Sequence, residues 1–183
     1  MNKQKKHEQT VFLTTAAVIA GLYTALTVGL APISFGLVQC RVAELLTVLA
    51  VYTPAAVPGL TVGCALSNVI GLTMGSNIAG ALDILLGTLA TGLAALLSCR
   101  WRRYRLWGLP VLSTLPPVVL NALIVGSELA AVSPSFTWEV WGIQVGLVAA
   151  GQAVACIGGG LVLAGVLEKS GAKRIFKSNT QYR

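Results

Sequence analysis

The sequence predicts an all-α membrane protein, a bundle of six transmembrane helices with both termini cytoplasmic and a short second helix. Three observations support this fold class. Only 10% of the 183 residues are charged, whereas a soluble domain carries about 25%. Apolar stretches of about 20 residues, long enough to cross a bilayer, recur along the chain. The basic residues occupy short clusters between these stretches, which is typical of membrane topology rather than of nucleic-acid binding.

The first predicted span, residues 11–31, follows a basic segment and resembles a secretory signal peptide. Its apolar run is longer than the usual signal-peptide core and no convincing cleavage site follows, so we interpret it as a retained helix. The second span, 41–53, has 13 residues and would cover only about 20 Å as an α-helix. We expect either a short helix shielded by its neighbours or an irregular, extended entry to it.

The remaining four spans complete the bundle. They are predicted at residues 56–73, 79–98, 109–132 and 142–167. Proline has no amide hydrogen and disrupts the interior of a helix, so Pro110, Pro116 and Pro117 are expected to bend the fifth span or delay its start. The predicted organisation is an N-terminal tail over 1–10, a transmembrane domain over 11–168 and a basic C-terminal tail over 169–183.

The charges predict the orientation. Six spans place both termini and the loop between the fourth and fifth spans on the same side of the membrane. Twelve of the thirteen basic residues fall on that side, and Arg41 is the exception. The positive-inside rule makes that side cytoplasmic.

The sequence lacks the motifs of the common enzyme and metal-site classes. Its four cysteines, Cys40, Cys64, Cys99 and Cys156, form no C-x-x-C pair, and His7 is the single histidine. Clustered Cys and His ligands are therefore absent from the sequence, and we predict no metal centre and no cofactor. There is also no phosphate-binding loop, no G-x-S-x-G and no H-E-x-x-H, so we expect a protein that is not an enzyme.

Polar residues gather at one predicted depth in the outer half of the membrane. Antiparallel threading places Glu44, Asp83 and Glu128 at a common level, together with Arg41, and brings Asn68 and Asn121 close to it. Each charge at membrane depth costs about 2.5–3.5 kcal/mol on insertion scales and usually faces a bundle interior or a watery cavity. One reading is a self-satisfied network, for example an Arg41–Glu44 ion pair. The other is a binding chamber, because surplus acid in a low dielectric requires protonation or a donor-rich, cationic ligand.

Small residues form a stripe on the first span. Ala17, Gly21 and Ala25 recur every four residues, and Ala16 and Ala20 form a second, adjacent row. Small residues at this spacing let another helix approach closely. The stripe predicts either a docking surface for a partner protein or ordinary packing within the bundle.

Three segments resemble the QueT family, substrate-binding S components of energy-coupling-factor (ECF) transporters. They contain S-F-G-x-x-Q-x-R-x-x-E near residue 40, L-D-x-x-x-G-T-L-A-T near residue 85, and P-P-x-x-x-N-A-x-I-V-G-x-E near residue 120. The resemblance implies a prokaryotic plasma-membrane protein with a six-helix substrate-binding domain. It also implies capture of a queuosine precursor, chiefly 7-aminomethyl-7-deazaguanine, from outside, and docking through the first helix on a T subunit with two ATPases. A stand-alone proton-coupled transporter of a small cationic or nucleobase-like solute is the alternative.

The ligand that the resemblance implies matches the polar residues. A carboxylate accepts the paired N–H donors of a deazaguanine base, and we assign Glu128 or Glu44 to that edge. Asp83 is assigned to the cationic aminomethyl group or to a structural role, and Arg41 to orienting Glu44 or donating to the base carbonyl. The remaining candidates are the amide partners Asn121, Asn68 and Gln39 and the stacking residues Phe35, Trp138 and Trp141. For the tryptophans, an interfacial aromatic belt is an equal alternative.

Overall fold

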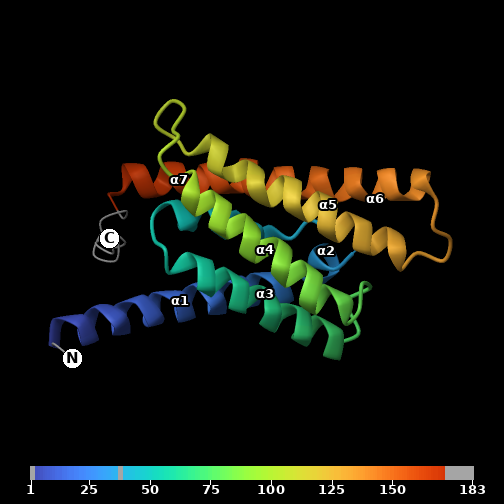
Figure 1. The fold of residues 1–183 in the computed structure, drawn as a ribbon, viewed down its shortest axis with the longest axis horizontal. Helices are drawn as coiled ribbons and strands as arrows, with labels where there is room; N and C mark the ends of the chain where they lie inside the picture. The colour runs from blue at the N-terminus through green and yellow to red at the C-terminus, as the bar shows by residue number, and fades with distance from the viewer. Residues whose placement is uncertain (1–2, 37–38, 172–183) are drawn as a thin grey trace.

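The computed structural model describes residues 3–36 and 39–171, and this part of the chain contains helices and loops but no β-strand. The helices lie roughly along one long axis (Figure 1). Their bounds are α1 Lys3–Gly29, α2 Ala31–Ser34, η1 Val42–Val51, α3 Ala56–Thr73, α4 Leu82–Arg100, η2 Val111–Thr114, α5 Leu115–Ala131, α6 Trp138–Gln152, η3 Ala153–Gly159 and α7 Gly160–Lys169.

The all-helical prediction is confirmed, but a count of six spanning helices is not. Among the described residues, five helical stretches are long and apolar enough to cross a membrane: Gln4–Gly29, Ala56–Thr73, Leu82–Arg100, Val111–Ala131 and Trp138–Lys169. The last is a single run through α6, η3 and α7, with η3 a π-helical turn. The second predicted span, 41–53, corresponds to η1, which is too short to belong to this group. The chain is therefore a multi-pass membrane protein with one short internal helix.

The short second helix is a 3₁₀ helix of ten residues. A 3₁₀ helix rises about 2 Å per residue, so η1 covers about 20 Å with fewer residues than an α-helix needs. The backbone before it is irregular: Gln39 has a φ of +40°, in the left-handed region that non-glycine residues seldom occupy. Both expected features, a shielded short helix and an irregular entry, are present, since most of η1 is buried.

The start of α1 differs from the sequence-based prediction, whereas the start of α5 agrees with it. Helix α1 begins at Lys3 rather than at residue 11, inside the predicted tail. No glycine or proline interrupts residues 3–10, and Lys, Gln and Glu favour helices, so the polar segment continues the apolar helix. The prolines act on the fifth span as predicted: a 3₁₀ turn follows Pro110, and α5 starts only at Leu115.

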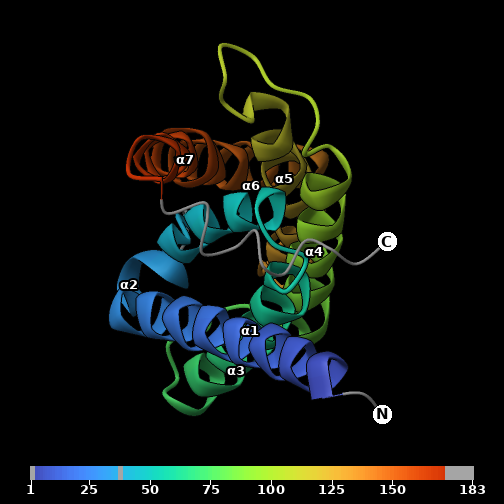
Figure 2. The ribbon, with the colours of Figure 1, turned by 90° about the vertical axis from the view of Figure 1, so that its left-hand side faces the viewer.

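Helix η1 lies at the centre of the bundle. It contacts α1, α3 and α4 on one side and η3 and α7 on the other. Helices α1 and α3 pack side by side, α4 lies between α3 and α5, and α6 lies along α5 (Figures 1 and 2). The start of α1, the loop after α4 and the end of α7 lie at one end of the molecule (Figure 1). We call this end, which carries Lys5, Lys6, Arg100–Arg105 and Lys169, the basic end.

Two glycines set the distance between α1 and α3. A Cβ on Gly59 would lie 2.7 Å from the backbone oxygen of Ala16, and one on Gly63 would lie 2.9 Å from that of Ala20. Both contacts are closer than a side chain tolerates. The row Ala16–Ala20 therefore packs within the bundle, whereas Ala17, Gly21 and Ala25 are exposed on the outer face of α1.

Candidate functional site

Arg41 is the most unusual buried side chain of the protein. It is 1% exposed and precedes η1 with a non-helical backbone (φ −81°, ψ 89°). Its Nη2 donates to Oδ2 of Asp83 at 2.7 Å, and both side chains are at most 2% exposed. Its guanidinium also lies over the ring of Phe35, 5.5 Å from the ring centroid. Burying two charges is costly, and removing either partner leaves the other unpaired.

Asp83, at the start of α4, is held by two asparagines. Asn77 in the preceding loop donates to its Oδ2 at 3.0 Å, and Asn68 of α3 donates to its backbone carbonyl at 2.6 Å. A Cβ on Gly87, one turn later, would collide with Oδ1 of Asp83, so the glycine provides the space for this carboxylate. Its Oδ1 has no protein hydrogen-bond partner.

Glu44 is completely buried in η1. Its Oε1 accepts hydrogen bonds from the Tyr23 hydroxyl of α1 at 2.6 Å and from Thr91 of α4 at 2.7 Å. Its Oε2 has no protein partner. The Arg41–Glu44 ion pair considered above is not formed, because the carboxylate that pairs with Arg41 is that of Asp83 at the start of α4.

Glu128 near the end of α5 differs from the other two acids. It is 3% exposed, yet neither carboxylate oxygen has a protein hydrogen-bond partner. It lies close enough to Asp83 and Arg41 to interact electrostatically with both. Asn121, two turns earlier on the same helix, is also buried and donates to the carbonyl of Pro117 at 2.9 Å. The carboxylate of Glu128 is thus buried and available.

The buried polar centre has more free acceptors than free donors. Buried atoms without a protein partner include the donors Arg41 Nε and Gln39 Nε2. The acceptors without one include Glu44 Oε2, Asn68 Oδ1, Asp83 Oδ1 and both carboxylate oxygens of Glu128, and the buried hydroxyls of Thr27 and Ser34, which can donate or accept, also lack a partner. Buried polar groups are nearly always hydrogen-bonded. This excess of acceptors suits a ligand rich in N–H donors.

The aromatic candidates separate into two places. Phe35 is 1% exposed and fills the space above Gly71 of α3, where a Cβ would come within 2.6 Å of its ring. Trp141 is half-buried and donates to the hydroxyl of Ser127, the neighbour of Glu128, at 2.9 Å. Trp138 is 77% exposed and stacks edge-on with Trp141 at 6.1 Å. Its exposure suits the interfacial-belt reading.

Four residues of this centre were not predicted as site residues from the sequence: Tyr23, Thr91, Asn77 and Cys64. The sulfur of Cys64 lies 3.5 Å from Arg41 Nη1 and 3.4 Å from the Thr91 hydroxyl. The sequence could have indicated two of them as site residues. Tyr23 is a polar phenol in an apolar helix, and Asn77 is an amide in a polar turn. Thr91 is the last residue of the motif L-D-x-x-x-G-T-L-A-T, but its residue type, like that of Cys64, is ordinary in membrane helices and indicated no contact with Glu44.

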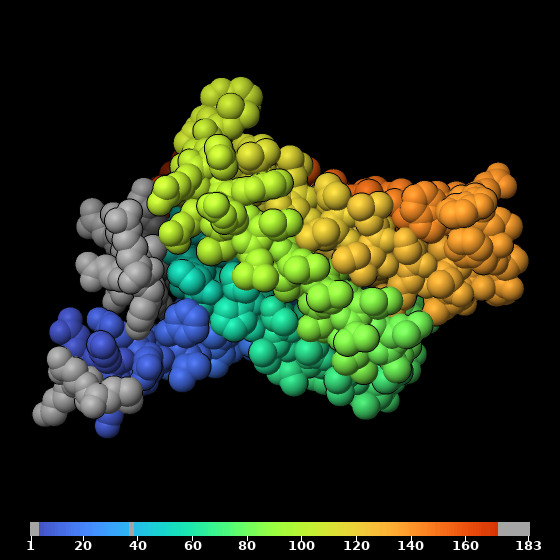
Figure 3. Space-filling model, in the orientation of Figure 1, coloured from blue at the N-terminus to red at the C-terminus, as the bar shows by residue number. Residues whose placement is uncertain are grey.

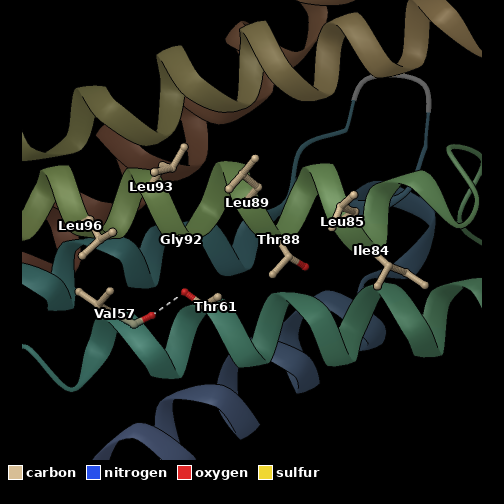
Figure 4. Close-up of a pocket in the computed structure, with 9 residues that line it drawn as sticks. All are labelled: Val57, Thr61, Ile84, Leu85, Thr88, Leu89, Gly92, Leu93 and Leu96. Atoms are coloured by element: carbon tan, nitrogen blue, oxygen red, sulfur yellow. Dashed lines mark hydrogen bonds between the residues drawn. The ribbon is translucent and has the colours of Figure 1, made fainter.

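An apolar groove of about 350 Å³ between α3 and α4 is separate from the polar centre. Figure 4 shows Leu85, Leu89 and Leu93 along one helix and Val57 and Thr61 along the other, with the Thr61 hydroxyl bonded to the Val57 carbonyl. Leu85 is 70% exposed. The groove therefore belongs to the apolar outer surface and contributes none of the predicted site residues.

Comparisons with known proteins identify one family and one relative. The model of a family described as "QueT transporter" matches residues 13–169. The "Queuosine precursor transporter QueT" of Lactococcus lactis subsp. cremoris is 37% identical over 82 residues, which are 44% of this chain and 48% of that protein. The chain thus spans about half the length of that relative. No solved structure matches the chain.

Proposed function

Because this chain belongs to the QueT transporter family, we propose that it is the substrate-binding subunit of an ECF-type importer. It captures a queuosine precursor, 7-aminomethyl-7-deazaguanine or a related deazapurine, in an outward-facing site. A T subunit and two ATPases then drive delivery to the cytoplasm. The partner ATPases supply the energy, and this chain supplies binding and positioning.

The observation that carries the proposal is the excess of buried, unpartnered acceptors. Glu128 offers two carboxylate oxygens without a protein partner, matched to the paired N–H donors at the amidine edge of the base. Glu44 and Asp83 each offer one more, which suits the cationic aminomethyl group. Arg41 Nε and Gln39 Nε2 are the free donors for the carbonyl of the base. Phe35, buried beside Arg41, provides a ring face for stacking.

Direct binding tests the substrate. Purified protein in nanodiscs is titrated with 7-aminomethyl-7-deazaguanine, and adenine and riboflavin serve as controls. We expect heat of binding for the deazaguanine alone. Equal indifference to all three compounds rejects the substrate assignment. The same titration with 7-cyano-7-deazaguanine, which lacks the cation, measures what the aminomethyl group contributes.

The docking surface is proposed on the exposed face of α1. Ala17, Gly21 and Ala25 lie on this face, whereas Ala16 and Ala20 are occupied by α3. Gly21→Leu should prevent co-purification of the T subunit and abolish uptake while leaving ligand binding intact. Gly146→Leu on α6 is the matched control, because a Cβ at either glycine meets no atom within 4 Å. Normal uptake by Gly21→Leu removes α1 as the contact surface.

A second candidate function rests on Glu128. A buried acid without a protein partner is also a suitable proton carrier, as a stand-alone proton-coupled transporter requires. The two functions differ in their energy source. An S component loses uptake when ATP is depleted and keeps it when the proton gradient is collapsed, and a proton-coupled transporter shows the reverse.

The proposed location is the plasma membrane of a prokaryote, with both termini cytoplasmic. The basic end supports this orientation through the positive-inside rule, and Asp83 and Glu128 lie toward the opposite end of their helices. Cysteine labelling with a membrane-impermeant reagent tests it. A cysteine at Lys5 should react only in broken cells, and one at Ser135 should also react in intact cells.

A further inference from the structure

The loop between α4 and α5 contains a well-defined hairpin. Leu106 and Leu109 exchange backbone hydrogen bonds of 2.9 and 3.0 Å. The two residues between them, Trp107 and Gly108, have φ values of +50° and +79°, as in a two-residue type I′ turn. Trp107 at its tip is 90% exposed. A tryptophan that has a left-handed backbone conformation and an exposed side chain is unusual in a connecting loop.

The hairpin is fixed to the bundle by Arg105. Its Nη1 donates to Glu168 of α7 at 2.6 Å and to the carbonyl of Gly108 at 3.1 Å. Its guanidinium also lies over the ring of Tyr52, 5.8 Å from the centroid. One side chain thereby joins the turn to the end of α7 and to the segment after η1. The hairpin has a defined position.

The hairpin projects sideways at the basic end. Figure 1 shows it standing off the long axis beside the end of α4, and the view along the axis in Figure 2 shows it extending beyond α5. In the space-filling view it forms a protrusion at that end (Figure 3). If the long axis of the bundle follows the membrane normal, a sideways projection stays within the interfacial layer. Tryptophan is enriched at that depth.

A groove of about 300 Å³ lies between the hairpin and the start of α5. Its walls are apolar: Leu106, Leu112 and Leu115 line it and are 51%, 39% and 38% exposed. Its polar lining residues are Tyr104 and Arg105. An apolar groove with a phenol and a guanidinium along it matches an amphiphile rather than a polar solute or a simple alkyl chain.

The charge beside the groove is positive and uncompensated. Arg100, Arg102 and Arg103 directly precede the groove residues in the chain. Within residues 3–36 and 39–171, the ion pairs are Arg41–Asp83 and Arg105–Glu168, so none of these three arginines is paired with a carboxylate. No ion pair with a carboxylate of the described residues neutralises these arginines, so the surface beside the groove suits an anionic headgroup. Each basic residue near a membrane surface attracts anionic lipid by about 1 kcal/mol.

We propose that this groove binds an anionic phospholipid. An acyl chain lies along Leu106, Leu112 and Leu115, the phosphate contacts the guanidinium groups of Arg102 and Arg103, and the indole of Trp107 sits at headgroup level. The charge complementarity and the interfacial position identify this occupant. The inference concerns the basic end of the molecule and is independent of the ligand proposed for the polar centre.

Fluorescence quenching by brominated lipid tests the site. A variant that keeps Trp107 as its sole tryptophan (Trp101→Phe, Trp138→Phe, Trp141→Phe) is reconstituted into phosphatidylcholine vesicles. Each preparation contains the same mole fraction of brominated phosphatidylglycerol or brominated phosphatidylcholine. We expect local enrichment of the anionic lipid, and so stronger quenching by it. Adding Arg102→Gln and Arg103→Gln should reduce that enrichment roughly tenfold or more. Lys5→Gln with Lys6→Gln should leave it unchanged, because both residues belong to the start of α1, which lies on the side of the molecule away from the hairpin (Figure 2).

Each outcome decides the proposal. Equal quenching by both lipids means that Trp107 reaches the interface without selecting anionic lipid, and overturns it. Absence of quenching places the hairpin in water, available to a protein partner, and also overturns it. Native mass spectrometry gives a second measurement on the protein with all its tryptophans. Co-purified phosphatidylglycerol should be retained by the lysine variant and lost by the arginine variant, and equal retention contradicts the site.

Discussion

The three acids at membrane depth lie in two regions. These regions differ in whether the buried carboxylates have protein partners. In the first, formed by α1, η1, α3 and α4, Asp83 pairs with Arg41 and Glu44 accepts from Tyr23 and Thr91. In the second, at the end of α5, Glu128 is equally buried and has no protein partner. The first region is arranged before any ligand arrives. We therefore expect the first region to contribute more to the stability of the bundle, and Glu128, which has no protein partner, to contribute mainly to ligand binding.

The largest effect on stability is expected from Asp83→Ala. It leaves the Arg41 guanidinium buried without an anion, which typically costs about 3–5 kcal/mol. Chemical unfolding in detergent measures this loss. The double change Arg41→Met with Asp83→Leu removes both charges and should recover most of it. If Asp83→Ala unfolds like the unaltered protein, the ion pair does not stabilise this region.

A smaller loss is expected from Gly87→Ala. The added methyl group would collide with Oδ1 of Asp83 and displace the carboxylate from Arg41, at a cost of about 1–3 kcal/mol. Gly146→Ala on α6 is the control, because nothing lies within 4 Å of a Cβ there. Equal unfolding of the two variants would show that Gly87 does not position Asp83.

The hydrogen bonds to Glu44 come next. Tyr23→Phe and Thr91→Val each remove one donor from Oε1, and we expect a loss of about 1–2 kcal/mol for each. Because both donors serve one oxygen, the double variant leaves Glu44 without a side-chain partner and should lose more than the sum. A double-mutant cycle on unfolding free energies checks this. Simple additivity would argue against a shared role.

Glu128→Gln should have the smallest effect on stability, within about 0.5 kcal/mol, because no protein hydrogen bond is lost. Ligand affinity should nevertheless fall about tenfold or more, since the amide replaces one acceptor of the paired contact with a donor. Unfolding and calorimetric titration of the same preparation measure both quantities. A large loss of stability with unchanged affinity would reverse the roles assigned to the two regions.

Much of the architecture was predictable because it depends on local properties. Hydropathy over about 20 residues located the long helices. The late start of α5 was predicted from Pro110, Pro116 and Pro117, because proline disrupts the interior of a helix. The extension of α1 to Lys3 was missed because a charge cluster was read as a tail, although Lys, Gln and Glu continue a helix readily. The shortness of η1 was predicted, but its 3₁₀ form was not, and η1 packs against six other elements that local sequence does not reveal.

The composition of the polar centre was predictable, but its pairing was not. Antiparallel threading placed Arg41, Asp83 and Glu128 at a similar depth from residue counts alone. The choice of Asp83 over Glu44 as the partner of Arg41 depends on how α4 packs against the segment before η1, which no periodicity reveals. Tyr23 was missed for a similar reason, since the direction of one side chain on α1 depends on how Gly59 and Gly63 seat that helix.

The most direct test of the central claim is thermal unfolding with and without 7-aminomethyl-7-deazaguanine, comparing the unaltered protein with Glu128→Gln. We expect the same unfolding temperature for both proteins alone, and a ligand-induced rise for the unaltered protein only. A similar rise for both would show that Glu128 does not bind the base. A lower unfolding temperature for Glu128→Gln without ligand would show that this carboxylate belongs to the scaffold.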